Sequence, residues 1–281
     1  MKRFILAVII ITLAFSADCF ALNLRPYMQT PPEVQVFAKR VIEDGGKVVD
    51  LEYCQKYTRL SKQLIVWSNG KFVGDANMGV KLNSGVSVQT LYDLSGNNND
   101  ATSGVTVNNQ PVWTKNVQGG RAGMVFDGND VLKKTLGAAI ENPSTVIFIG
   151  KQTATNSAYK VGFDGITTNR RNLISYNTGV NGNLMLFAGA SLISGFNVIN
   201  VPLLLTAIFN GASSDFLKDG SSIVSGNCGA QGIDGISVGD DWDTAYPWIG
   251  SIDSIIVFNI ALNSAQRQAC ENFVNAYYSI Y

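Results

Sequence analysis

The segment LYDLSGNNNDA at residues 91–101 completes a β-type run and then turns the chain. The run Ser87–Asp93 contains the β-branched and aromatic residues that are typical of strands. Asn and Asp side chains bond readily to nearby backbone groups, so Ser95–Asp100 is predicted to form a tight loop. We therefore expect Tyr92 to point into the core between two sheets, and Asp93 to serve the fold rather than a ligand.

Downstream of Val66 the chain continues as short β-type runs separated by Gly, Asn, Asp and Ser. Lys218-Asp219-Gly220 lies between two such runs and predicts a tight hairpin, because Asp-Gly supplies the positive φ of a type I′ turn. Many short strands with regular turns indicate an all-β, antiparallel β-sandwich of the jelly-roll type rather than βαβ units. The predicted strands are Ser87–Asp93, Gly123–Phe126, Thr145–Lys151, Asn172–Tyr176, Asn183–Phe187, Pro202–Phe209, Asp215–Leu217, Ser221–Val224, Ile236–Val238 and Ile252–Phe258.

The part of the chain before these strands is predicted to be helical. Thr30 is expected to cap a first helix and Pro31 to occupy its first position. A second helix is expected to start at Asp50. We therefore predict that residues 22–66 form a helical hairpin packed on a sandwich of residues 67–281. The apolar stripe of the first helix is formed by Val34, Phe37, Ala38, Val41 and Ile42.

The C-terminal end of the chain is also predicted to be a helix, which starts at Asn263 with Gln266 in the capping-box position. Several further segments accompany the first one: Gln110-Pro111, MVFDGND at 124–130, WIGSID at 248–253 and FNIAL at 258–262. Together they resemble the concanavalin A-like lectin/glucanase superfamily, in its laminin-G-like jelly-roll branch, over residues 85–281. The resemblance implies two stacked antiparallel sheets, and the helical preface is similar to that of bacterial and phage-encoded members.

The N-terminal residues read as an export signal. A basic start is followed by the uncharged, mostly apolar run Phe4–Phe15, which has the length of a signal-peptide core and is too short for a spanning helix. We predict a signal peptide at residues 1–21, cut after Ala21 or alternatively after Ala17, and an uncleaved anchor is the competing interpretation. The protein is accordingly expected to be secreted, periplasmic or on the cell surface, with no stable membrane span after cleavage.

Composition excludes several kinds of chemistry. The chain has no His, which rules out Ser-His-Asp and Cys-His catalysis and His-ligated metals. The 21 Lys and Arg balance the 21 Asp and Glu, so the net charge is zero. A neutral chain lacks the basic surface that attracts phosphate backbones, and we expect no nucleic acid as a partner.

Three cysteines remain after the predicted cleavage: Cys54, Cys228 and Cys270. An oxidising compartment permits a disulfide, and Cys54 and Cys270 fall on predicted helices that can pack together. A Cys54–Cys270 disulfide is one expectation, and three free buried thiols are the other.

The superfamily includes glycoside hydrolases, which use paired carboxylates. An α-L-arabinofuranosidase of the fungal B type shares the Tyr-Asp-x-Ser-Gly-x-x-Asn pattern, and Gly239-Asp240-Asp241 resembles the stretch that holds its proton donor. Asp241 is therefore the catalytic residue that the resemblance implies. The strand Asn183–Phe187, where the nucleophile is expected, offers Met185 but no carboxylate. Half a carboxylate pair does not support a double displacement, so the prediction leans away from an enzyme.

The loop Gly239–Trp248 concentrates residue types that grip sugars. Aromatic rings contact the CH face of a sugar, and planar polar side chains bond to its hydroxyl groups. The predicted ligand-binding residues are Trp242, Asp241, Asp243, Tyr246 and, from another part of the chain, Trp113. Trp248 precedes a strand and fits the core. The competing interpretation is that the loop is only a solvated hairpin tip.

The same loop offers oxygen atoms for a cation. Asp240, Asp241 and Asp243 are candidate Ca²⁺ ligands, since Ca²⁺ takes six to eight oxygen ligands. Laminin-G-like relatives are known to hold calcium near such loops. The spacing is not that of an EF-hand and no Glu is at hand as a bidentate ligand, so we expect no cofactor, with Ca²⁺ as the alternative.

These observations lead to a functional expectation with alternatives. The first is an exported, non-catalytic carbohydrate-binding or adhesion module that recognises a glycan or another surface polymer. The second is a glycoside hydrolase of the α-L-arabinofuranosidase B type. The third is a structural domain of a surface or phage-derived assembly.

Overall fold

The computed structural model of the chain describes residues 30–83, 85–103, 107–153, 159–177 and 183–281. The predicted signal peptide, residues 1–21, lies outside the described residues. No helix in the described part of the chain is long and apolar enough to cross a membrane.

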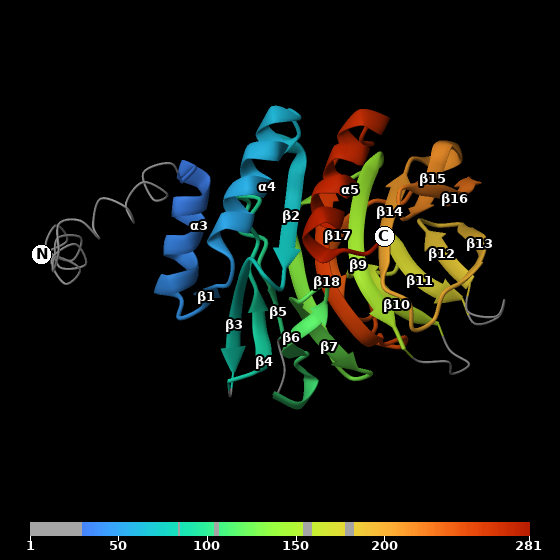
Figure 1. Cartoon of the computed structure of the whole chain (residues 1–281). Coiled ribbons are helices and arrows are strands. Elements are labelled where there is room, and N and C mark those ends of the chain that lie inside the picture. The colour runs from blue at the N-terminus through green and yellow to red at the C-terminus, as the bar shows by residue number, and fades with distance from the viewer. Residues whose placement is uncertain (1–29, 84, 104–106, 154–158, 178–182) are drawn as a thin grey trace, which may run out of the picture.

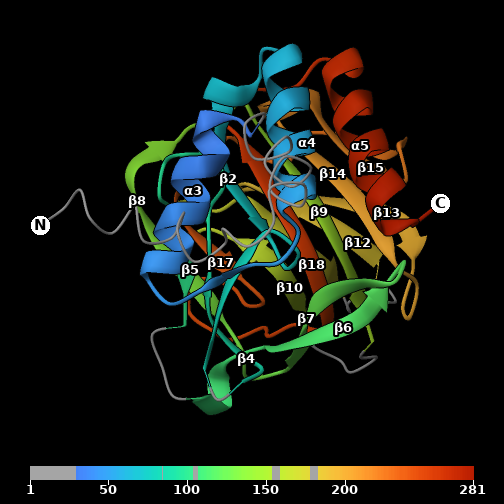
Figure 2. The same cartoon turned by 60° about the vertical axis from the view of Figure 1, so that its left-hand side comes forward.

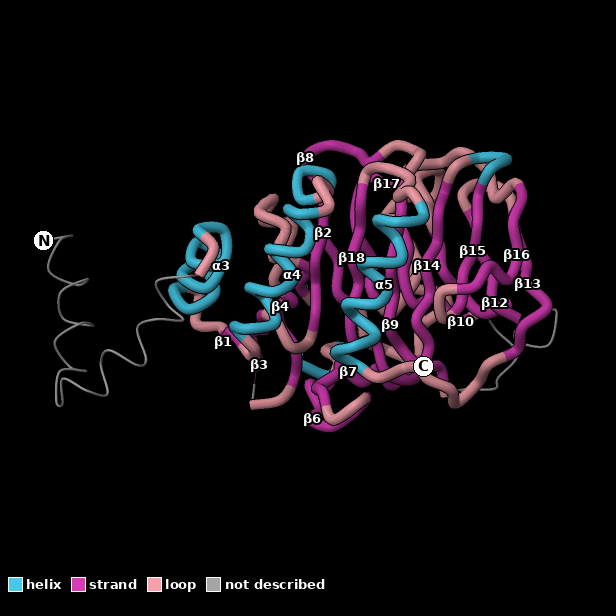
Figure 3. The backbone as a smooth tube through the Cα atoms, turned by 45° about the horizontal axis from the view of Figure 1, so that its top comes forward, coloured by secondary structure: helices cyan, strands magenta, loops and turns pink. Residues whose placement is uncertain are grey.

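Two antiparallel sheets face each other and enclose the main core (Figure 1, Figure 3). The helix-covered sheet consists of β16 (Ser221–Gly226), β15 (Ser214–Lys218), β14 (Leu203–Phe209), β9 (Ser144–Gln152) and β18 (Ile249–Phe258), with β7 (Arg121–Asp127) and β2 (Gly70–Asp75) along the other edge of β18, and β6 (Val112–Gln118) beyond β7. The open sheet runs through β13 (Ser191–Asn197), β12 (Asn183–Phe187), β11 (Leu173–Asn177), β10 (Lys160–Asp164), β17 (Ile233–Val238), β8 (Leu132–Ile140), β5 (Ala101–Thr102), β4 (Ser87–Leu91), β3 (Gly79–Asn83) and β1 (Lys47–Val48).

Helices cover the outer face of the first sheet. α4 (Leu51–Gln63) and α5 (Ser264–Tyr278) lie side by side across it, and α3 (Pro32–Glu43) packs next to them against β1 and β3 (Figure 2). The rings of Tyr53 on α4 and Tyr277 on α5 stack with their centroids 3.6 Å apart. A second apolar cluster therefore fills the space between the helices and the sheet.

The sequence of β9 shows why these layers form. Val146 and Phe148 point between the sheets, whereas Ile147 and Ile149 point toward the helices. Successive side chains of a strand face opposite sides, so a strand covered on both faces must be apolar throughout. The expected all-β sandwich with helices at both ends is confirmed.

The predicted strands are all present, and most are longer than the sequence suggested. The hairpin between β15 and β16 has φ values of 51° at Asp219 and 80° at Gly220, as a type I′ turn requires. Several further strands were not predicted: β1, β2, β3, β5, β6, β8, β10 and β13.

Two of the three predicted helix starts are confirmed. The side chain of Asp50 accepts a hydrogen bond from the backbone of Tyr53, and Asn263 forms a capping box with Gln266. The predicted cap at Thr30 is wrong: α3 starts at Pro32 with Pro31 as its N-cap, and no side chain caps it. A residue before proline is disfavoured in helical geometry, which keeps Pro31 outside the helix.

Within the 91–101 segment, Asp93 has the structural role that we expected: its side chain fixes the turn. The Asp93 carboxylate accepts hydrogen bonds from the backbone of Val73, Ser95 and Asn99 and from the Ser95 hydroxyl, all within 3.0 Å. Tyr92 is buried, but in the cluster beneath the helices rather than between the sheets, where we expected it. Tyr92 N donates to Gly79 O on β3, and β3 packs against α3, so the Tyr92 ring lies on the helix side of the sheet.

The expected Cys54–Cys270 disulfide is not formed. Both are free, buried thiols in the cluster beneath the helices, and Cys228 is free and buried in the main core. Burial raises the pKa of the Cys270 thiol to about 12, which suppresses the reactive thiolate. The alternative expectation of three free buried cysteines matches the structure.

Two carboxyl groups lie deep beneath α5. Tyr278 Oη donates to Asp75 Oδ1 at 2.7 Å, whereas Asp253 Oδ1 has no hydrogen-bond partner among the described residues. Burial raises the pKa of Asp75 to about 6 and, together with the charge of Asp75, the pKa of Asp253 to about 8. Tyr278 Oη also lies 3.2 Å from the backbone oxygen of Asp253, so the C-terminal helix is attached next to a carboxyl group whose pKa is raised.

Candidate functional site

The outer face of the open sheet carries an apolar cluster that contains no helix residue. Val161, Leu173 and Met185 form its buried base on β10, β11 and β12. Phe187, Ile193 and Tyr246 pack against this base and are half-buried. We call the surface formed by these side chains and Tyr159 the aromatic face. It is on the opposite side of the sandwich from α4 and α5.

The Gly239–Trp248 loop brings Tyr246 onto this face. The ends of the loop are joined by a hydrogen bond of 2.8 Å from Trp248 N to Gly239 O. Trp248 is buried in the main core with its ring 5.6 Å from that of Phe148, as expected for a core residue. The base of the loop is thus fixed, and the residues between lie at the margin of the open sheet.

Two tyrosines form the most exposed part of the aromatic face. The rings of Tyr159 and Tyr246 meet edge to face with centroids 5.3 Å apart and planes at 76°. Tyr159 is 37% exposed. Such a pair presents ring surfaces and hydroxyl groups to a ligand. Each ring restricts the motion of the other, so little side-chain entropy is lost when a ligand binds.

A charged cluster borders the aromatic face. Arg171 donates twice to Asp164 Oδ2, at 2.9 and 2.7 Å, and its guanidinium lies 3.5 Å from Asp241 Oδ2. The same guanidinium lies 5.6 Å from the centre of the Phe187 ring. Burial raises the pKa of Asp164 to about 6 although Arg171 acts to lower it. Arg171 is therefore held in place by its carboxylates beside an aromatic ring.

The two buried aspartates of the loop do not fit the calcium site that we predicted. Asp240 Oδ1 accepts from the backbone of Asp241 and Tyr246, and Asp241 Oδ1 accepts from the backbone of Ala245. Burial raises the pKa of Asp240 to about 7 and raises the pKa of Asp241 as well. Only Asp243 is exposed. The described part of the chain contains no group of three or more acidic or cysteine side chains arranged for a metal.

The burial of Asp241 and its contact with Arg171 also affect its suitability as a catalytic residue. Its relative exposure is 1%, and that of Asp164, which shares its arginine, is 0%. A general acid must lie within hydrogen-bond reach of the glycosidic oxygen that it protonates. In this arrangement the two carboxylates hold Arg171 and the loop backbone, which is a structural role.

The structure keeps most of the predicted ligand residues together but separates one. Trp242 and Asp243 lie in the loop next to Tyr246, where Trp242 is half-buried and its carbonyl accepts from Lys133 Nζ at 2.9 Å. Trp113 lies elsewhere, on β6. Its indole Nε1 donates to Ala76 O, and Lys47 Nζ lies 3.5 Å from its ring centre. The ring and the donor of Trp113 serve the fold, and Trp113 is not among the residues of the aromatic cluster, so its role as a ligand residue stays a prediction.

Sequence reasoning missed Tyr159, Arg171 and Phe187. Phe187 ends a predicted strand, and its outward direction follows from Leu184 and Leu186 facing the core. This alternation of side chains along the strand could have predicted that Phe187 faces outward. Nothing local in the sequence placed Tyr159 next to Tyr246, because the two are joined only through the pairing of distant strands.

Comparisons with known proteins support the fold. No protein-family model matches the chain, and no curated protein sequence matches it. The receptor-binding domain of botulinum neurotoxin D is similar with a TM-score of 0.54 and 16% identity, covering 74% of this chain and 53% of that one. A sialidase from Trypanosoma rangeli, solved with 2,3-difluorosialic acid, has a TM-score of 0.50 and 11% identity over 80% of this chain and 39% of its own.

A smaller protein is also similar. Domain 4 of a GH43 extracellular arabinanase from Geobacillus stearothermophilus, solved with arabinotriose, has a TM-score of 0.44 and 16% identity over 59% of this chain and 81% of its own. This chain spans about half or less of the toxin and sialidase chains. At these identities the likeness to the toxin domain and to the sialidase shows the fold alone, a β-rich sandwich.

Proposed function

We propose that the protein is an exported, non-catalytic carbohydrate-binding or adhesion module of the concanavalin A-like type. Its ligand is a glycan or another surface polymer, bound across the aromatic face of the open sheet. The observation that carries this proposal is the edge-to-face pair of Tyr159 and Tyr246 on a sheet face without a covering helix. Export follows from the predicted signal peptide at residues 1–21.

The chemistry of the aromatic face suits a polysaccharide. Sugar rings have apolar CH faces and polar edges, so a binding surface needs exposed rings beside fixed polar groups. Tyr246, Tyr159 and Phe187 supply the rings, and the Arg171 cluster and Asp243 lie beside them. Trp242 lies in the same loop as Tyr246 and is half-buried. An open face rather than a closed cavity fits a chain of sugars that extends beyond the protein.

The test is retention on insoluble polysaccharides, with soluble glycans screened on an array. We compare the wild type with Tyr246→Ala, Trp242→Ala and the control Tyr281→Ala, which removes a tyrosine that is 54% exposed at the C-terminus. Loss of one stacking ring is worth about 1 kcal/mol, so Tyr246→Ala should weaken retention roughly fivefold. Tyr281→Ala should leave it unchanged.

The outcomes separate the site from the function. If the wild type is retained and neither loop variant weakens it, the aromatic face is not the binding surface. If the wild type binds no polymer and no glycan of the array, carbohydrate recognition itself is refuted.

A further inference from the structure

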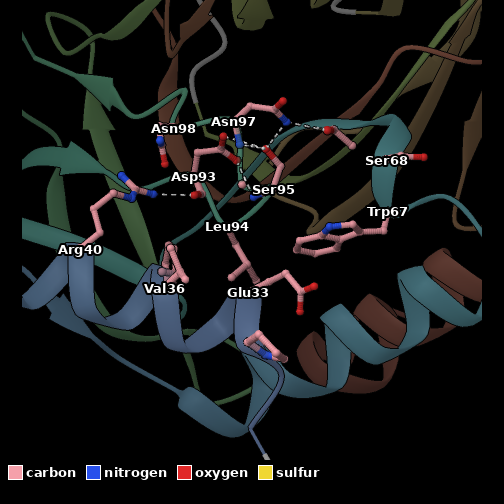
Figure 4. Close-up of a pocket in the computed structure, with 14 residues that line it drawn as sticks. Glu33, Val36, Arg40, Trp67, Ser68, Asp93, Leu94, Ser95, Asn97 and Asn98 are labelled. Atoms are coloured by element: carbon pink, nitrogen blue, oxygen red, sulfur yellow. Dashed lines mark hydrogen bonds between the residues drawn. The ribbon is translucent and has the colours of Figure 1, made fainter.

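A cavity of about 450 Å³ lies on the other side of the molecule, between α3, the 3₁₀ turn η1 (Trp67–Asn69) and the loop that follows Asp93 (Figure 4). Its volume falls within the range of small-ligand sites, about 300–1,000 Å³. None of its lining residues belongs to the aromatic face. The cavity is therefore a separate candidate site.

Part of the wall of this cavity is apolar and includes two aromatic rings. Phe37 and Leu94 are buried at its base, and Val36, at 67% exposure, borders its opening. Trp67 is half-buried, and Figure 4 shows its indole extending into the cavity from η1. An indole in this position presents a flat apolar surface to whatever enters.

Most polar groups around the cavity already have partners within the protein. Arg40 pairs with Asp100 and donates to Asp93 O, and the Asn97 amide donates to Gly70 O and to Ser95 Oγ. These residues form a rigid frame. The positive charge of Arg40 is balanced by Asp100, so the frame does not attract anions.

Glu33 differs from the other polar groups. Lys62 Nζ donates to Glu33 Oε1 at 2.5 Å, whereas the buried Oε2 has no hydrogen-bond partner among the described residues. Burial acts to raise the pKa of Glu33, but the hydrogen bond and charge of Lys62 outweigh it, so the pKa lies below its ordinary value. Figure 4 shows this side chain directed from α3 toward Leu94 and Trp67. The cavity wall thus contains a carboxylate with one oxygen that has no donor among the described residues.

We propose that this cavity binds a single neutral sugar ring. One face of the ring stacks on Trp67, a hydroxyl group donates to Glu33 Oε2, and the exposed amide of Asn98 contacts a further hydroxyl at the rim. Lys62 balances the charge of Glu33, as Asp100 balances that of Arg40, so neutral sugars bind more tightly than acidic or cationic ligands. This inference rests on the proposed function for the ligand class alone, and it concerns a second, independent site.

The experiment titrates the full chain with methyl glucoside, methyl galactoside and N-acetylglucosamine, and with sialic acid and choline as competing chemistries. Binding is followed by saturation-transfer NMR. Trp67→Ala and Glu33→Gln should each weaken the best neutral sugar at least tenfold. Glu52→Gln is the matched control, because Glu52 forms a similar exposed pair with Lys56 on α4. Glu52→Gln and Tyr246→Ala should leave this binding unchanged.

Glu33→Gln preserves the shape of the side chain and keeps the test decisive even if Trp67→Ala fails to fold. The inference is overturned if no neutral sugar binds, if Glu33→Gln has no effect, or if choline or sialic acid binds better. Polymer retention measured on the same variants separates the two proposals. If Tyr246→Ala loses polymer retention and no neutral sugar binds in the cavity, the second site is refuted and the proposed function stands.

Discussion

The two outer faces of the sandwich are both apolar, but they are covered differently. On the helix-covered sheet, Ile147 and Phe258 lie beneath α4 and α5 and are fully buried. On the open sheet, Leu173 and Met185 are covered by half-buried aromatic side chains, with no helix residue in the cluster. The same alternation of apolar residues therefore produces a second core on one side and a ligand-sized surface on the other.

The difference suggests a division between residues that stabilise the fold and residues that take part in the binding proposed for the aromatic face. A helix removes a whole strip of sheet from water and adds its own apolar face, so residues beneath it contribute mainly to folding. A rim of aromatic side chains covers the sheet only in part. Residues of that rim keep surface for a partner and contribute less to folding.

The largest expected effect is on the helix-covered side. Phe258→Ala should lower the free energy of unfolding by about 3–5 kcal/mol, because it removes a fully buried ring and leaves a cavity. Urea denaturation measures the change. Phe258→Leu serves as the control and should cost clearly less. A loss below 1 kcal/mol for Phe258→Ala would show that the helices do not seal this face.

On the open side the strongest effect on stability should come from the charged cluster. Arg171→Met leaves Asp164 buried without its partner and should cost about 3 kcal/mol at pH 7.5. Adding Asp164→Asn removes the uncompensated charge and should recover most of that loss in the same denaturation assay. If the double variant is no more stable than Arg171→Met, Asp164 is not the group that the arginine neutralises.

The buried carboxyl of Asp253 should make stability depend on pH. Its pKa is about 8 in the folded protein against an ordinary value of 3.8, so unfolding releases a proton between these values and rising pH favours the unfolded chain. Between pH 7 and 8 the wild type should lose up to ~1.4 kcal/mol of unfolding free energy. Above about pH 8 the loss should level off.

Asp253→Asn should remove most of this dependence between pH 7 and 8, and the smaller remainder comes from Asp240, whose pKa is about 7. Asp164→Asn is the control and should retain it, because the pKa of Asp164 is only about 6 and its charged neighbours are Arg171 and Asp241 rather than Asp253. Thermal unfolding of the three proteins at pH 7.0, 7.5 and 8.0 decides the matter. Equal slopes for the wild type and Asp253→Asn would place the titrating group elsewhere.

The smallest effect on stability should come from the aromatic face. Phe187→Ala removes a half-buried ring and should cost about 1 kcal/mol, well below the cost of Phe258→Ala. Polysaccharide retention should nevertheless fall several-fold. A large loss of stability, or retention equal to that of the wild type, would mean that Phe187 belongs to a core like that of the other face.

Local patterns predicted much of the fold. Asp219-Gly220 sufficed for a hairpin, and Asn263 with Gln266 marked the start of α5, because these signals depend on residues close together in the chain. Strand β8 was missed: three of its outer positions are Gly137, Ala138 and Ala139, which lack strand character and are exposed. Its strand geometry comes from pairing with the distant β17.

The candidate site was predicted only in part. The composition of the Gly239–Trp248 loop pointed to Tyr246, but its aspartates proved to be bonded to backbone and to Arg171. Which oxygen atoms remain free depends on how the loop closes, which no local pattern shows. Arg171 and Tyr159 join the site through strand register, a property of the whole sheet.

The most direct test of the aromatic face uses methionine methyl groups as reporters. Met185 lies in the base of that face, whereas Met124 lies between the sheets and Met78 beneath the helices. The protein, labelled at methionine methyls, is titrated with the oligosaccharide that the array identifies. We predict that the Met185 signal shifts and saturates with the glycan while the Met78 and Met124 signals stay in place. A Met185 signal that is unchanged at saturation would contradict binding on the open sheet.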